Sequence, residues 1–100
     1  MHVGMRMPPM HRDLGVDGTI KWAAENGFGS VDLPDASPAH RKLCTEVGIG
    51  VGSVDWGAGG DVLSLDAGKR RKGVADTKKR IRETARIGGS VVFLCLSPDD

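Results

Sequence analysis

The sequence predicts an α/β fold in which parallel β-strands alternate with helices. Three times along the chain, an amphipathic run ends at a glycine and a short apolar, β-branched segment follows within a few residues. These three joints lie at residues 26–33, 47–55 and 87–96. Glycine ends a helix at low cost because it adopts the left-handed conformation readily. A helix-to-strand joint that occurs three times favours a parallel sheet covered by helices.

Capping signals place the expected helices. Asp17 is expected as the N-cap of the first helix, which stops at Gly27. The second helix begins at Ser37, which caps it, and the proline that follows occupies the first helical position. The third and longest helix is expected over residues 69–87. Its buried stripe at helical spacing is expected to be Val74, Thr77, Ile81, Thr84, Ala85 and Gly88.

Four short segments, mostly apolar on both faces, are the expected strands, as a buried parallel sheet requires. They are residues 3–7, 30–33, 51–54 and 90–96. If the strands add sequentially, right-handed crossovers put every helix on one side of the sheet, as in a (β/α)8 barrel. If the strand order reverses, the same elements make a small doubly wound sheet.

The favoured interpretation is one incomplete domain over residues 1–100, the N-terminal half of a (β/α)8 TIM barrel. It would hold the first three βα units and the fourth strand. The chain stops at Asp100, just past an apolar strand, where a barrel would continue with a loop and a helix. We therefore expect the chain to be truncated.

Composition excludes several classes of protein. The 100 residues are 39% hydrophobic and 27% charged with a formal net charge of +1, which is ordinary globular usage. Four aromatic residues, none of them Tyr, disfavour an aromatic stacking platform for nucleic acid. No stretch approaches the ~20 apolar residues of a membrane span, and residues 1–13 lack the apolar core of a signal peptide. A cytoplasmic protein with no membrane partner is expected.

Cysteine and histidine are too dispersed for a metal site or a disulfide framework. Cys44 and Cys95 belong to no CxxC or Cys/His array and lie in apolar segments. Both are expected to be buried free thiols in a reducing compartment. His2, His11 and His40 have no HxH or HExxH spacing, so no metal site is expected within this chain. We place His11 in an N-terminal loop and His40 on the exposed flank of the second helix.

Four segments in order resemble the xylose-isomerase-like sugar phosphate isomerases and epimerases, a TIM-barrel family. The segments are residues 23–33, 47–51, 63–71 and 81–92. The first looks like the family's joint in which a helix is followed by a Gly-aromatic pair and by a strand that ends in an acidic residue. The second and third look like the family's next joint and its lead into the third helix. The fourth looks like its joint in which a helix is followed by Leu-Gly-Ala and then a strand. Asp32 stands where the family often has Glu, and Gly89 stands where Ala is usual.

The resemblance implies a parent enzyme that moves a proton next to the carbonyl of a small sugar or keto-sugar. Such enzymes often hold a divalent metal with carboxylates and a His, which lie on later strands of the barrel. The resemblance therefore implies an N-terminal fragment that binds no metal, carries no catalytic residue and is inactive alone. Its part would be to supply walls of the substrate pocket.

Candidate substrate-binding residues lie at the carboxyl ends of the expected strands, where parallel barrels carry their functional side chains. They are Arg6, Asp32, Asp55 and Trp56, with Ser97 and Asp99 after the fourth strand. Arg6 would contact phosphate or hydroxyl oxygens, the two aspartates would accept from sugar hydroxyls, and Trp56 would wall the pocket. The alternative is that the acids are caps or turn residues, which aspartate favours in strand-to-helix loops.

Three further interpretations remain open. The glycine-rich residues 57–60 follow the third strand and are a candidate phosphate contact through backbone N–H groups. Residues 69–86 hold nine of the 14 Lys and Arg, opposed only by Asp76 and Glu83. This stretch would bind nucleic acid in a small α/β module, although a solvated outer face is favoured. Finally, two copies of a half-barrel would complete each other as a homo-oligomer by covering their open sheet edges.

Overall fold

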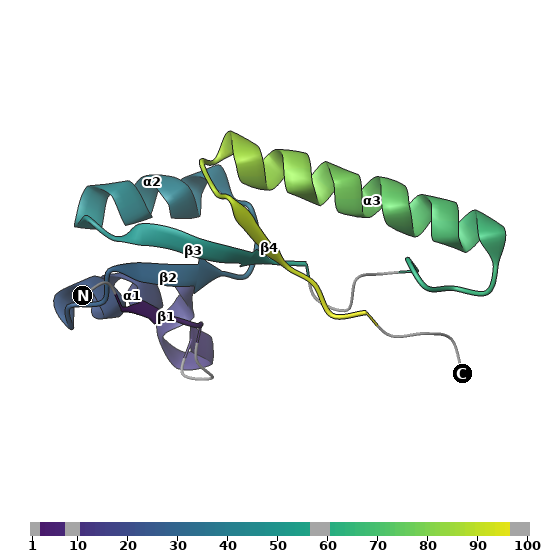
Figure 1. The fold of residues 1–100 in the computed structure, drawn as a ribbon. Helices are drawn as coiled ribbons and strands as arrows, with labels where there is room; N and C mark the ends of the chain where they lie inside the picture. Colours follow the sequence, from purple (N-terminus) through teal and green to yellow (C-terminus); the bar gives the residue numbers. More distant parts are fainter. Residues whose placement is uncertain (1–2, 8–10, 57–60, 97–100) are drawn as a thin grey trace.

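The computed structural model describes residues 3–7, 11–56 and 61–96 and has the predicted α/β fold. Strands and helices alternate along the whole described chain (Figure 1). The elements are β1 (Gly4–Met5), α1 (His11–Glu25), β2 (Ser30–Leu33), α2 (Pro38–Val47), β3 (Gly50–Asp55), α3 (Ala67–Arg86) and β4 (Val91–Phe93).

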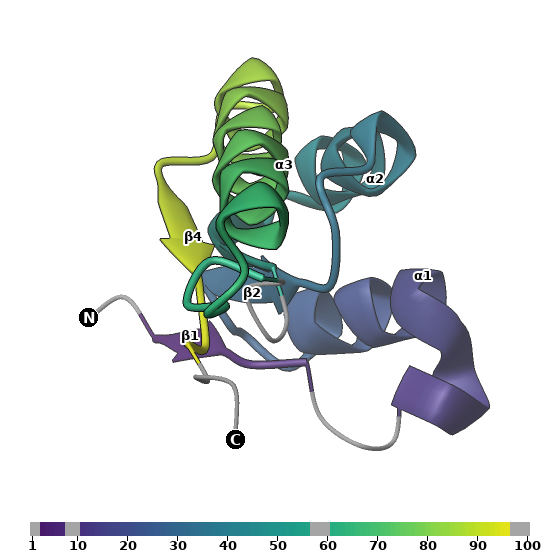
Figure 2. The same ribbon diagram turned by 90° about the vertical axis from the view of Figure 1, so that its right-hand side faces the viewer.

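The strands form one parallel sheet in the order β1-β2-β3-β4. Seen from the side, the three helices gather on one side of the strands and curve around them (Figure 2). A sequential order with helices on one side is the arrangement of a half β/α barrel, and it excludes the doubly wound alternative, in which the strand order reverses. Both edges of the sheet, β1 and β4, pair on one side only among the described strands.

Glycines end the helices as predicted, and α2 shows the mechanism. Ser37 caps this helix, with its Oγ accepting from the N–H of His40 at 3.4 Å. The helix ends at Gly48, whose φ of 78° is left-handed, and strand β3 begins two residues later. Gly27 and Gly88 adopt the same conformation after α1 and α3. The helix-to-strand joints inferred from sequence are therefore confirmed.

Helix α1 differs from its prediction. It begins at His11 and is kinked at Gly15, whose φ of 72° and ψ of 171° are not helical. Asp17 therefore lies within the helix rather than at its N-cap, and His11 belongs to the first helical turn rather than to a loop. The physical reason is Gly15, because a residue without Cβ lets one helical turn join the next through a left-handed step.

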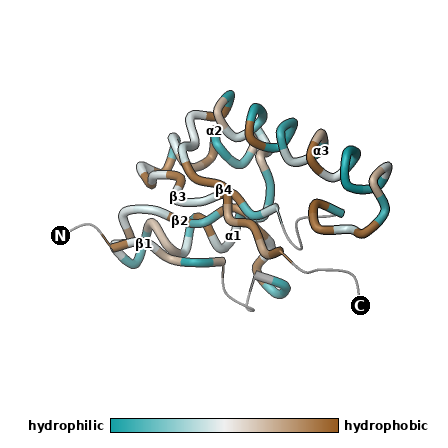
Figure 3. Tube along the Cα trace, turned by 45° about the vertical axis from the view of Figure 1, so that its right-hand side comes forward, coloured by the Kyte–Doolittle hydropathy of each residue, from teal (hydrophilic) through white to brown (hydrophobic). Residues whose placement is uncertain are grey.

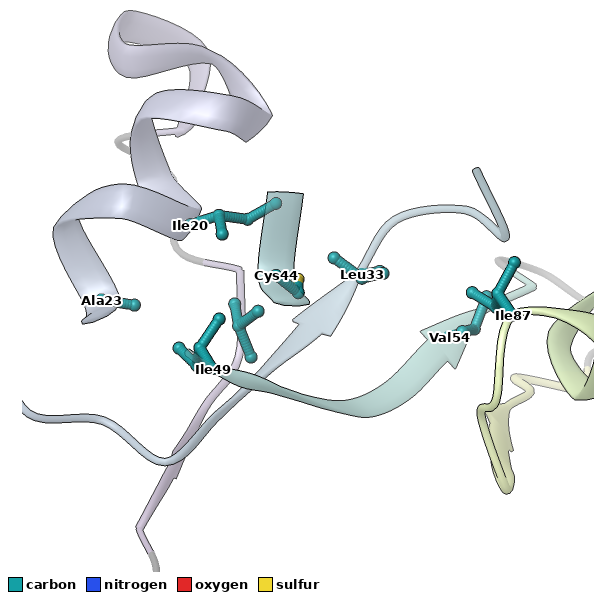
Figure 4. Close-up of a cluster of buried hydrophobic side chains, with 8 residues drawn as sticks. Ile20, Ala23, Leu33, Cys44, Ile49, Val54 and Ile87 are labelled. Carbon is teal, nitrogen blue, oxygen red and sulfur yellow. The ribbon is translucent and has the colours of Figure 1, made fainter. Parts of the chain in front are cut away.

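The core lies between the helices and the sheet (Figure 4). It is formed by eight side chains from five elements or their flanks: Ile20, Ala23, Val31, Leu33, Cys44, Ile49, Val54 and Ile87. Burial raises the pKa of the Cys44 thiol above its ordinary value of 9.0. Cys95 is exposed, so the expectation of two buried thiols is wrong for this residue. It follows strand β4, at the edge of the sheet, where no neighbouring described strand covers it.

Helix α3 buries only part of the predicted stripe, since Thr84 is buried and Thr77 half-buried whereas Ala85 and Gly88 are exposed. Gly73 and Thr84 are buried, while Val74 and Ile81 are exposed. A Cβ at Gly73 would lie 2.7 Å from the backbone of residues 61–62, so only glycine allows this close approach. The helix thus packs through small residues, and its apolar flank is left uncovered.

None of the helices in the described ranges has both the length and the apolar character needed to cross a bilayer.

Candidate functional site

A cavity of about 380 Å³ opens at the carboxyl ends of the strands. Arg6, Asp32 and Asp55, three of the four predicted binding residues, line it together. They come from the ends of three successive parallel strands, which is why residues far apart in sequence meet here. The other lining residues are Met7, Leu33, Pro34, Ser53 and Phe93. The volume lies within the range of small-molecule sites, about 300–1,000 Å³.

Asp32 is held in place by an irregularity of the sheet. One residue of β2 lies between Val31 and Leu33, whereas two residues of β3 lie between their partners Val51 and Val54. This is a β-bulge, and the Asp32 Oδ1 accepts from the N–H of Ser53 at 2.9 Å within it. Asp32 is therefore part of the sheet and also lines the cavity, and it is not a cap or turn residue in a strand-to-helix loop.

Glycine is needed opposite this carboxylate. A Cβ on Gly52 would overlap the Asp32 Oδ1, so a larger residue would displace the carboxylate. The Oδ2 of Asp32 accepts no hydrogen bond from the described residues. A carboxylate fixed through one oxygen presents the other to a ligand hydroxyl at little cost in side-chain entropy.

Arg6 and Phe93 meet across the open face of the sheet. The Arg6 guanidinium carbon lies 5.5 Å from the centre of the Phe93 ring, within cation–π range. Arg6 follows β1 and Phe93 belongs to β4, so the contact joins the first strand to the last. Phe93 was not singled out from sequence. Side chains alternate between the two faces of a strand, so Phe93 lies on the face opposite Val92. This two-residue alternation is the sequence signal that would have identified Phe93 as a candidate.

Trp56 does not line this cavity. Its Nε1–H donates to the Thr77 Oγ1 at 2.9 Å, and the Arg80 guanidinium carbon lies 4.9 Å from its ring centre. These contacts place Trp56 beneath α3, beside a second cavity of about 180 Å³ lined also by Asp76, Lys79 and Glu83. The expectation that Trp56 walls the strand-end pocket is therefore corrected. Its ring instead packs against the helix that follows β3.

The chain matches no protein-family model, and no curated protein shows significant similarity to it. Membership of the isomerase and epimerase family thus remains a resemblance carried by the four sequence segments. The fold and the strand-end cavity are independent of it.

His40 is less exposed than predicted. Its side chain is 19% exposed, with Nδ1 at 3.0 Å from the Asp35 Oδ1 and Nε2 at 3.6 Å from the Asp17 Oδ1. Asp35 also accepts from the N–H of Ser37, the cap of α2. The imidazole therefore joins α1 to the start of α2, which is a structural role.

No three His, Cys, Asp or Glu side chains gather closely enough to hold a metal ion within the described ranges. Asp32 and Asp55 are the carboxylates that line the strand-end cavity among the described residues. Ser97, Asp99, His2 and the glycine-rich residues 57–60 lie outside the described residues.

The basic stretch of α3 is mostly exposed, and part of it has intramolecular partners. Lys72 donates to Asp76 at 2.6 Å, which raises the Lys72 pKa through hydrogen bonding and charge attraction. Lys79 lies 3.9 Å from Glu83. These pairs are four residues apart on one helix, which is the usual arrangement of a solvated helix surface. Nothing among the described contacts specifically favours nucleic acid.

Proposed function

We propose that the strand-end cavity binds a small sugar or keto-sugar, free or as its phosphate ester. The observation that carries the proposal is one guanidinium and two carboxylates, from three successive strand ends, around a single cavity of about 380 Å³. In parallel α/β folds, ligands bind at the carboxyl ends of the strands. The lining offers both hydrogen-bond acceptors and hydrogen-bond donors, which suits a polyhydroxylated ligand.

Each lining residue has a distinct role in this proposal. The Oδ2 of Asp32 accepts a hydrogen bond from a sugar hydroxyl, because the Oδ1 is already bound to Ser53. Asp55 contributes a second carboxylate from the end of β3. Arg6 donates to a phosphate or hydroxyl oxygen with a fork of N–H groups suited to such oxygens. Phe93 gives the cavity an apolar wall.

The reaction served by this site is, by resemblance, isomerisation or epimerisation, in which a proton moves next to the sugar carbonyl. In the family that the chain resembles, the proton-transferring groups lie on later strands of the barrel, so the residues assigned here supply binding and orientation. The 100-residue chain is accordingly expected to bind the sugar without converting it to product.

Calorimetric titration of the chain tests this proposal, with a ketose, the same ketose as its phosphate ester, and inorganic phosphate. Arg6→Gln should weaken binding of the ester by about tenfold or more, because a hydrogen bond between charged groups is lost. Asp55→Asn should weaken binding of both sugars. Lys42→Gln is the matched control, since Lys42 is exposed on α2, away from the cavity.

Two results would overturn the proposal. One is the absence of saturable binding of either sugar to the native chain. The other is equal affinity of Arg6→Gln, Asp55→Asn and Lys42→Gln for the sugars. Binding of inorganic phosphate as tight as that of the ester would contradict the sugar assignment, because the carboxylates would then contribute nothing.

A further inference from the structure

In the part of the chain that the structure describes, large exposed apolar side chains lie before β2 or after β3. Among the described residues, Val3 precedes β1, Leu14 lies in the first turn of α1, and the others lie within residues 63–96, from the loop before α3 to the segment after β4. The central elements β2, α2 and β3 expose none. Hydropathy mapped on the chain shows the same apolar segments on β4 and before α3 (Figure 3). The apolar surface is therefore arranged as two separate patches on opposite edges.

At the β4 end the patch is extensive. Val91 of the strand is 53% exposed, Ile81 of α3 is 50% exposed, and Leu96 follows β4 with a similar exposure. Val74 continues the row along the helix, two turns before Ile81. A strand edge and a helix flank that are apolar side by side have the form of a surface onto which another βα layer packs.

The molecule also exposes more surface than compact monomers of the same mass do. Its accessible surface is 6390 Å², whereas monomers of its mass expose about 5,500 Å². Its radius of gyration is 15.0 Å, against about 13 Å for a compact domain of this length. A chain of this shape buries less of its own surface than a compact domain of the same length does.

Symmetry restricts how one partner can cover both patches. All four strands run in the same direction with β1 and β4 at the edges. A two-fold axis parallel to the strands keeps that direction, places the β1 of a second copy beside β4, and places its β4 beside β1. Eight parallel strands then close without an edge. A two-fold axis perpendicular to the sheet would pair only β4 with β4 and leave both β1 edges open.

Charge favours the same pairing. Residues 69–86 carry nine of the 14 basic residues and two of the 13 acidic ones, so the rest of the chain has five basic and eleven acidic residues. The two-fold arrangement turns the exposed flank of α3 toward α1 of the other copy. Helix α1 carries Asp13, Asp17 and Glu25 against Arg12 and Lys21, and Asp17 lies 3.6 Å from His40 of α2 in the same copy. The basic flank of α3 would therefore face a helix of small net negative charge.

We propose that a second copy of this chain covers both edges, forming a two-fold dimer in which two half-barrels complete one another. The interface joins β4 and the Val74–Ile81 flank of α3 to β1 and α1 of the other copy. The proposed interface runs along β4 and β1, and Phe93 of β4 and Arg6 after β1 also line the sugar cavity. Sedimentation in the absence of sugar therefore tests the association separately from sugar binding.

Sedimentation equilibrium of the 100-residue chain, from micromolar to near-millimolar concentration, tests the proposal. The expected mass is twice the 10.6 kDa of the chain, falling toward one chain on dilution. Ile81→Glu should raise the dimer dissociation constant at least about tenfold, because a carboxylate would be buried without a partner. Ala39→Glu is the matched control. It adds the same charge at an exposed position of α2, outside both patches.

Circular dichroism of both variants separates a lost interface from a lost fold, and Ile81 is exposed enough for the monomer to keep its structure. Amide hydrogen exchange supplies the geometry, since dimerisation should protect amides of β1 and of β4 together. A monomer at every concentration, equal dissociation constants for Ile81→Glu and Ala39→Glu, or protection of β4 without β1 would each overturn the proposal.

Discussion

Replacing Asp32 separates its role in the sheet from its role in the cavity. Asp32→Ala removes the acceptor of the Ser53 N–H within the β-bulge. A hydrogen bond to a charged group contributes about 1.5–3 kcal/mol, and the lower part of that range applies because both residues are only partly buried. A loss of about 1.5–2 kcal/mol corresponds to a fall in Tm of roughly 6–16 °C for a domain of this length.

Asp32→Asn provides the matched comparison, because the amide oxygen can still accept from Ser53. Thermal denaturation followed by circular dichroism should show less than half of the Asp32→Ala effect for this variant. Sugar affinity should nevertheless fall in Asp32→Asn, since the ligand-facing oxygen loses its charge. Glu46→Gln, on the exposed face of α2, serves as the control for removing a carboxylate. The reasoning would be refuted if Asp32→Ala melted at the wild-type temperature.

Three other changes test neighbouring parts of the structure. Gly73→Ala should lower the denaturant midpoint despite the better helix propensity of alanine, because its Cβ meets loop backbone; a raised midpoint would disprove the close approach. N-ethylmaleimide should label Cys95 and spare Cys44, as mass spectrometry of the folded chain can show, and equal labelling would contradict the burial of Cys44. Since burial raises the Cys44 pKa, folding favours the neutral thiol. The contribution of this thiol to the free energy of unfolding is complete below pH 9.0 and is lost as pH rises through the raised pKa. Trp56→Phe should lower the free energy of unfolding by about 0.5–1.5 kcal/mol, because the hydrogen bond to Thr77 is lost, and should leave sugar affinity unchanged. Weakened sugar binding would show that Trp56 contacts the sugar after all.

Local signals were sufficient to predict most of the fold. Gly48 ends a helix and precedes a strand because its backbone conformation is decided by neighbours in sequence. The ends of the strands followed from the same joints, and they brought Arg6, Asp32 and Asp55 to one edge of the sheet. In a parallel sheet the carboxyl ends of all strands lie at the same edge, which is why these residues meet there.

Features set by distant contacts could not be predicted in this way. The inward face of α3 depends on loop backbone that approaches Gly73, so the helical period alone predicted the inward positions of Thr77 and Thr84 but not that of Gly73. Trp56 was assigned to the cavity from its position after β3, whereas its side chain turns toward Thr77. The bulge at Ser53 has one sequence signal, a glycine inside a strand at position 52.

The most direct test of the strand-end site is a two-dimensional NMR titration of the isotopically labelled chain with a ketose phosphate. Backbone amide shifts should be largest at Arg6, Asp32, Ser53 and Asp55, and those of residues on α2 should stay unchanged. Shifts concentrated on the basic residues of α3, or no saturable shift at the strand ends, would contradict a sugar site in this cavity.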